Sequence, residues 1–154
     1  MKNTSTKLRN LVIYQIYVRN FSANGNFKAV IDDLDRIKAL GVDIIYLLPI
    51  HPIGEKNRKG ELGSPYSIKD YNIVSDELGG LNGFIELIEA VHAKKMKIMM
   101  DIVFNHTSRD SRLLQEHPEW FHRNSLGEIA NRVGDWWDIV DLDYTKDKFS
   151  GLSC

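Results

Sequence analysis

The chain has 154 residues, enough for one ordinary domain with a sizeable core, and its 43% hydrophobic and 27% charged residues exclude a disordered tail. Its 20 Lys and Arg residues nearly balance 21 Asp and Glu residues, so no overall field attracts nucleic acid or anionic lipid. No apolar run approaches the ~18 residues of a membrane-spanning helix. We therefore expect neither nucleic acid nor a membrane as a partner.

The cysteine content and the N-terminal sequence indicate the cellular location of the protein. Cys154 is the only cysteine, which excludes an intrachain disulfide and a thiolate metal site. The positively charged N-terminus is followed by polar breaks at Arg9, Gln15 and Arg19, which is not the pattern of a secretory leader. These features predict a cytoplasmic location.

Apolar and amphipathic segments alternate along the first half of the chain. Residues 11–18 are rich in β-branched and aromatic side chains and end at a cluster of turn formers, which predicts a strand followed by a loop. Residues 27–40 place apolar side chains at helical spacing before Gly41, the residue type preferred at a left-handed helix end. Residues 43–48 are nearly uniformly apolar, which is typical of a strand covered on both faces.

A long Gly-rich, charged excursion over residues 51–80 separates this part from the next helix and strand. The helix carries an apolar face from Leu81 to Val91, and residues 98–103 predict a third buried strand. This order is typical of a β/α protein with right-handed crossovers. Both an open doubly wound sheet and a β/α barrel fit, but polar residues cluster at the C-terminal ends of the predicted strands, which favours the barrel.

Residues 107–144 have little periodicity and many aromatic side chains, which predicts a small inserted subdomain rather than a disordered segment. Trp120, Trp136 and Trp137 could act as sugar platforms, but packing of the subdomain is the commoner use of such rings, and we favour it. In the excursion, residues 56–59 (Lys-Asn-Arg-Lys) could hold an anion or a sugar hydroxyl. We interpret this charged run as a solvated turn.

Residues 101–106 read Asp-Ile-Val-Phe-Asn-His and end the third predicted strand. This stretch resembles the first conserved stretch of the α-amylase family of glycoside hydrolases, in which Asp, three apolar residues, Asn and His end the third barrel strand. Other stretches agree with the family in order and spacing: Gln15-Ile16-Tyr17, Leu47-Leu48-Pro49-Ile50, Ser64-Pro65-Tyr66 before Asp70-Tyr71, and Asp141-Leu142-Asp143-Tyr144. The resemblance runs from about residue 11 to residue 144.

The resemblance implies an α/β fold, namely a partial (β/α)8 TIM barrel. Residues 1–106 would form its first three β/α units, residues 107–144 the inserted irregular domain B, and residues 145–154 an irregular tail that we interpret as a premature stop. Closure is what removes sheet edges in a barrel, so an isolated three-stranded piece would expose an unpaired edge. We therefore expect poor solubility or association of the isolated chain.

The resemblance also assigns roles to five residues. Tyr66 matches the aromatic platform that stacks on the sugar ring before the scissile bond, and His106 matches the imidazole that hydrogen-bonds a sugar hydroxyl there. Asp101 matches a carboxylate that orients an arginine near the nucleophile, but no arginine of the chain is clearly placed for it. Asn105 and Asp141 match positions that coordinate calcium between the barrel and domain B, although calcium usually takes ~6 to 8 oxygen ligands.

The implied activity is retaining hydrolysis of α-1,4-glucans or maltooligosaccharides in carbohydrate metabolism, through an oxocarbenium-like transition state. In the family, the nucleophilic aspartate follows the fourth strand and the acid/base glutamate follows the fifth. Neither segment occurs in the sequence, so we expect the catalytic residues beyond Cys154 and expect this chain alone to be inactive. A glucanotransferase or phosphorylase of the same family, and a non-catalytic truncation product, remain alternatives.

Other chemistries leave little trace in the sequence. There is no dinucleotide fingerprint and no phosphate-binding loop. The 5 histidines include no pair at the spacing of a helical zinc site.

Overall fold

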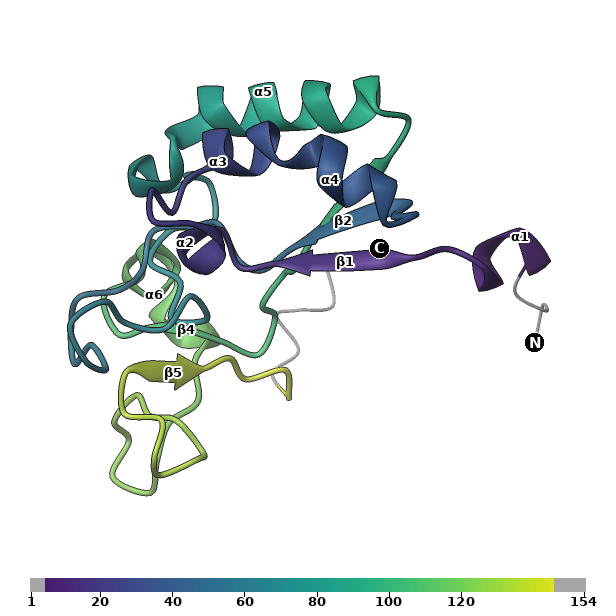
Figure 1. The fold of residues 1–154 in the computed structure, drawn as a ribbon. Coiled ribbons are helices and arrows are strands. Elements are labelled where there is room, and N and C mark those ends of the chain that lie inside the picture. The colour runs from purple at the N-terminus through teal and green to yellow at the C-terminus, as the bar shows by residue number, and fades with distance from the viewer. Residues whose placement is uncertain (1–4, 146–154) are drawn as a thin grey trace. The chain divides into compact units, whose positions relative to one another are not determined.

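The computed structural model describes residues 5–145 (Figure 1). Contacts divide the chain into two compact units, and each unit is interrupted in sequence. The first unit contains the residues up to Ile50 together with Val74–Asp101, and the second contains His51–Ile73 together with the residues from Ile102 onward. Most of the excursion therefore packs with the later segment, whereas the sequence analysis placed it with the barrel units.

A parallel three-stranded sheet in the order β1-β2-β3 forms the centre of the first unit. The strands are β1 (Ile13–Ile16), β2 (Ile44–Leu47) and β3 (Lys97–Met100). Their register places Tyr14, Ile45 and Ile98 in one row across the sheet, and Ile16, Leu47 and Met100 in another. Because successive side chains point to opposite faces of a strand, these two rows share one face, which is the face that packs into the core.

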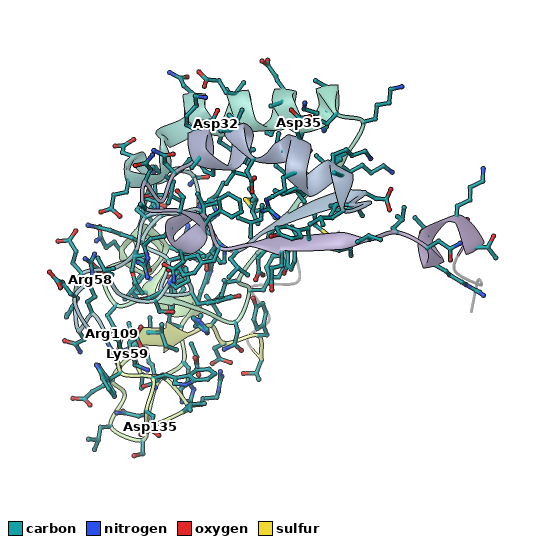
Figure 2. All side chains as sticks on the ribbon, viewed as in Figure 1. Asp32, Asp35, Arg58, Lys59, Arg109 and Asp135 are labelled. Carbon is teal, nitrogen blue, oxygen red and sulfur yellow. The ribbon has the colours of Figure 1, made fainter. Side chains whose placement is uncertain are left out.

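Helices cover that face of the sheet. The helices α3 (Phe27–Asp32), α4 (Leu34–Ala39) and α5 (Gly80–Ala93) lie on the same side of β1 and β2 (Figure 1). Their fully buried side chains complete the core: Phe27, Val30, Leu34, Ile37, Leu87 and Val91. The charged residues between them, such as Asp32 and Asp35, remain exposed (Figure 2). The helical spacing read from the sequence is thereby confirmed.

The predicted helix over residues 27–40 is two helices that meet at Asp33. Asp33 has φ −103° and ψ 1°, and its carboxylate accepts hydrogen bonds from the guanidinium of Arg36, with Nε at 2.9 Å from Oδ1. This i, i+3 ion pair is compatible with a helix, and backbone hydrogen bonding continues through the junction, because Ile37 donates its N–H to the Asp33 carbonyl at 3.1 Å. Gly41 has φ +82° after the end of α4, which confirms the predicted left-handed helix end.

Short helical segments also occur where the sequence predicted loop. They are α1 (Thr6–Arg9), α2 (Val18–Phe21) and η1 (Asp76–Leu78). The predicted first strand therefore ends at Ile16 rather than at Val18, because the buried side chain of Val18 belongs to α2. No helix in the part of the chain that the structure describes is long and apolar enough to cross a membrane.

The opposite face of the sheet is open. Ile13 and Met99 point to this face and are 52% and 41% exposed, and β3 alternates exposed and partly buried residues along its length. Cover on both faces was predicted for residues 43–48 alone, and among the described residues Ile44 and Tyr46 of β2 lie on this face and are partly buried. A run of apolar residues indicates that each side chain can be buried. It does not show whether one face of the strand or both are covered by other elements.

The second unit is built around an antiparallel pair, β4 (His106–Ser108) and β5 (Ile139–Asp141). Its small core contains Phe121, Val140 and Leu142, and Trp120 packs against them. The remaining elements of the unit are α6 (Arg112–Glu116) and η2 (Pro118–Trp120). The packing role that we favoured for Trp120 is confirmed.

The excursion and β4 approach each other closely within the second unit. Ser108 donates its backbone N–H to the Ile68 carbonyl at 3.0 Å. A Cβ added to Gly54 would lie 2.2 Å from the Cβ of Ser108, which no folded chain tolerates, so only glycine fits at this contact. The carboxylate of Asp110 accepts the backbone N–H of Glu55 at 2.9 Å.

The open face of the sheet predicts self-association of the 154-residue chain. Light scattering after gel filtration should show a mass that rises with protein concentration, because the outer strands β1 and β3 and the open apolar face can pair with a second molecule. Met99→Lys should reduce this association while changing the free energy of unfolding by less than about 0.5 kcal/mol. A wild-type chain that stays monomeric at all concentrations would contradict the prediction.

Candidate functional site

A pocket of about 350 Å³ opens in the second unit. Its walls combine residues from the excursion, from the start of β4, and from the segment that leads into β5. The lining residues are Lys59, Ser64, Tyr66, His106, Trp136, Asp138 and Ile139. Small-molecule sites typically measure ~300 to 1,000 Å³ and pair aromatic walls with a few polar groups, so this pocket suits a small ligand such as one sugar ring.

Tyr66 presents its ring to this pocket from a tight turn. Its backbone N–H lies 3.2 Å from the hydroxyl oxygen of Ser64, and Pro65 between them restricts the backbone further. The residue is 37% exposed. A ring that is held by its backbone and accessible on the pocket wall has the geometry that a stacking platform requires.

His106 faces the same pocket from the first position of β4. Its Nδ1 lies 3.1 Å from the side-chain amide nitrogen of Asn105, and the ring also hydrogen-bonds the backbone of Tyr66. Burial lowers the pKa of His106, although the carboxylates of Asp141 and Asp138 and the Tyr66 backbone act in the opposite direction. The imidazole is therefore neutral at neutral pH and can donate or accept a hydrogen bond.

Tyr71 fixes the segment that carries His106. Its hydroxyl lies 2.9 Å from the Val103 carbonyl oxygen and 3.0 Å from that of His106, so one proton is shared between two backbone acceptors. Burial raises the pKa of Tyr71, and the nearby Tyr144 contributes to the rise, so the phenol stays protonated and able to donate. The sequence analysis included Tyr71 in a family stretch but gave it no role.

Asp101 belongs to the first unit and is not among the residues that line the pocket. It follows β3 and donates its backbone N–H to the Leu47 carbonyl at 2.8 Å. Its side chain pairs with Tyr46: burial raises the pKa of Tyr46, and the charge of Asp101 and its hydrogen bond raise it further. The partner that a half-buried carboxylate requires is thus a phenol in this structure.

Asn105 and Asp141 lie next to each other across the β4–β5 pair. Asp141 is the register partner of His106, and Leu142 donates its N–H to the Asn105 carbonyl at 2.9 Å. One carboxylate oxygen of Asp141, Oδ1, is buried without a hydrogen-bond partner among the described residues. A cation would satisfy that oxygen, but these residues do not complete a shell of ~6 to 8 oxygens, and calcium remains a prediction.

The side chain of Arg132 places a positive charge near Asp141 and Asp143. Its backbone N–H donates to Asp141 Oδ2 at 2.7 Å, and its guanidinium lies 3.7 Å from that oxygen and 3.8 Å from Oδ1 of Asp143. Both aspartates are buried. Since buried carboxylates need a compensating charge, Arg132 stabilises this pair.

The charged run of residues 56–59 is a solvated turn only in its first half, because Lys56 and Asn57 are exposed whereas Arg58 and Lys59 are partly buried. Arg58 donates from Nε to the Gly54 carbonyl at 2.8 Å and from Nη2 to the Ile53 carbonyl at 3.1 Å. Lys59 reaches the pocket, where its Nζ lies 3.5 Å from Asp138 Oδ1 and 4.6 Å from the centroid of the Trp137 ring (Figure 2). The sequence could not indicate the ion pair between Lys59 and the buried Asp138, because residues this far apart in the chain form no local pattern.

The prediction that Trp136 and Trp137 pack into the core of the subdomain was wrong. Trp136 and Trp137 are 43% and 52% exposed and do not belong to the core of the second unit. Trp136 instead lines the pocket, with its ring centroid 6.0 Å from that of His106. Both residues lie in a turn region before β5, so no periodic pattern in the sequence separates the ring that lines the pocket from its neighbour.

The sheet order, its parallel register and the helices on one face define part of a (β/α)8 barrel, and similarity to known proteins agrees. A family model for the α-amylase catalytic domain matches residues 6–147. An α-amylase structure from Lactobacillus plantarum is 55% identical with a TM-score of 0.90, covering 94% of this chain and 34% of that one. A maltogenic α-amylase from Thermotoga neapolitana is 35% identical with a TM-score of 0.83, over 94% and 34%.

The chain belongs to the α-amylase family. Among curated relatives, an α-1,4-glucan:maltose-1-phosphate maltosyltransferase from Picrophilus torridus is 34% identical over 89% of this chain and 24% of that protein. An α-glucosidase from Pediococcus pentosaceus is 34% identical over 82% of this chain and 21% of that protein. The chain thus spans about a quarter of the length of these curated relatives and about a third of the matched structures.

Removal of the Tyr71 hydroxyl should destabilise the second unit. Tyr71→Phe leaves two backbone carbonyls without their shared donor, which should lower the free energy of unfolding by about 1 to 2 kcal/mol. Urea denaturation followed by circular dichroism measures this change. Tyr14→Phe, in the other unit, serves as the comparison, because it removes a hydroxyl that bonds the exposed side chain of Arg36 and should change stability less. Equal stability of Tyr71→Phe and the wild type would show that the shared hydrogen bond contributes little.

His106 should make stability depend on pH in the weakly acidic range. Because its pKa is lowered on folding, the unfolded chain takes up a proton first as the pH falls below its ordinary value of ~6.5. The stabilising difference is therefore complete above that value and is lost as the pH falls toward the pKa of the folded state. Urea unfolding of wild type and His106→Gln between pH 5 and pH 8 measures this, and a difference that does not vary with pH would refute it.

Proposed function

We propose that the chain is part of the catalytic domain of an enzyme that acts on α-1,4-glucans or maltooligosaccharides, and that its pocket binds one glucose ring. The observation that carries the proposal is the meeting of Tyr66 and His106 in one pocket, in a chain 55% identical to an α-amylase of known structure. Both residues match sugar-binding positions of the family, and they come from segments that are forty residues apart.

Each side chain has a separate task in this proposal. The ring of Tyr66 offers an apolar surface to the C–H groups of the sugar, and the neutral imidazole of His106 can exchange a hydrogen bond with a hydroxyl group. A ring held at both places keeps its orientation while positive charge develops at the anomeric carbon. The residues of this chain therefore bind and orient the sugar.

The chemical step requires groups that this pocket does not supply. A retaining mechanism uses two carboxyl groups ~5 to 5.5 Å apart, one as nucleophile and one as proton donor. Asp138 is the one carboxylate among the lining residues, and it is buried beside Lys59. We assign the nucleophile and the acid/base to the remaining part of the catalytic domain, so the 154-residue chain alone should bind sugar without cleaving it.

Hydrolysis and transfer both remain compatible with the pocket. Identity of 55% to an α-amylase favours hydrolysis, whereas 34% identity to a maltosyltransferase supports transfer as the second candidate. The two reactions differ in the acceptor that attacks the glycosyl group, and the residues described here contact the donor ring. The proposal also includes a calcium ion at Asn105 and Asp141 and a cytoplasmic location. Sugar binding by the pocket depends on neither.

Calorimetric titration of the 154-residue chain with maltotriose tests the proposal. The chain should bind maltotriose and should bind the β-linked isomer cellotriose much more weakly. Tyr66→Ala should weaken maltotriose binding roughly tenfold, because it removes the stacking surface, and Tyr66→Phe should retain most of the affinity. Equal affinity for both trisaccharides, or an unaltered Tyr66→Ala variant, would overturn the assignment.

A further inference from the structure

Trp136 is the largest side chain on the pocket wall, and neither hydrophobic core accounts for it. It is 43% exposed, and its ring meets that of His106 at 63° with 6.0 Å between the centroids. An indole that packs into no core leaves a large apolar surface in contact with water. Such a residue is either unconstrained or kept in place for a ligand, and its neighbours distinguish the two cases.

The backbone that follows Trp136 is held at successive residues by distant groups. Arg109 donates from Nε to the Trp137 carbonyl at 2.5 Å, and Ser67 donates its hydroxyl to the Asp138 carbonyl at 3.1 Å. The carboxylate of Asp138 pairs with Lys59 at 3.5 Å. Figure 2 labels Lys59 and Arg109 beside β5. Three anchors on two consecutive residues fix the loop, so Trp136 is preorganised rather than free.

The charges around the ring also restrict the ligand. Lys59 is the one cation and Asp138 the one carboxylate among the lining residues, and the two lie within ion-pair distance of each other. The wall therefore has no net charge with which to recognise a phosphate group, and it suits an uncharged ring.

We propose that Trp136 is a second sugar-stacking residue of the pocket and that it determines affinity for an uncharged glucose ring together with Tyr66. The inference rests on the proposed function and deepens it. It adds Trp136, from the segment before β5, to Tyr66 and His106. The face of a pyranose carries several C–H groups, which match an aromatic surface and exclude water when they are covered. Two aromatic walls hold such a ring more firmly than one.

Substitution of Trp136 in the 154-residue chain tests the inference. Trp136→Ala should weaken maltotriose binding roughly tenfold in calorimetry, and Trp136→Phe should restore most of the loss. Trp137→Phe is the matched control, because Trp137 is exposed, does not line the pocket and keeps a ring beneath Lys59. Trp136 is largely on the surface, so thermal unfolding of all variants should remain close to that of the wild type.

The outcomes separate this inference from the proposed function. Wild-type binding that Tyr66→Ala weakens and Trp136→Ala leaves unchanged would overturn the role of Trp136 and leave the proposed function intact. A wild-type chain that binds no maltotriose would overturn both. Tighter binding of maltose 1-phosphate than of maltose would contradict the uncharged ligand, whereas equal or weaker binding supports it.

Discussion

The pocket depends on the close approach between the excursion and β4. Gly54 lies against Ser108 with no room for a Cβ, and the hydroxyl of Tyr71 joins the carbonyls of Val103 and His106. Tyr66 comes from one of these segments and His106 from the other. A shift between them would separate the two rings, so the pocket is a consequence of packing that involves neither ring.

Charge compensation is the second condition for this unit. Asp138, Asp141 and Asp143 are all buried near the end of the described chain, and each lies near a basic side chain. Lys59 serves the first and Arg132 the other two. Carboxylates removed from water without such partners would be strongly destabilising. Of these groups, Lys59 and Asp138 also line the pocket, so one ion pair both stabilises the unit and balances the charge of the pocket wall.

Apolar composition was enough to predict the three strands of the first unit, and helical spacing was enough to predict the region of α3 and α4 and the helix α5, because their buried residues recur on one face. The break at Asp33 escaped prediction, since the helical spacing of the buried apolar residues continues across it. Tyr66 and His106 could be found through the family register alone. Trp136 could not, because its orientation follows from Arg109 and Ser67, which lie 28 and 71 residues from their acceptors.

The order in which the pocket's walls leave the ribosome follows from their places in the chain. Lys59 is the first lining residue and Ile139 the last, a separation of 80 residues (139 − 59). At a synthesis rate of ~5 to 20 residues per second, roughly 4 to 16 seconds pass between them. The excursion emerges first, β4 next, and the tryptophan wall last. The pocket is therefore complete only after the last of these residues has been synthesised and β5 can pair with β4.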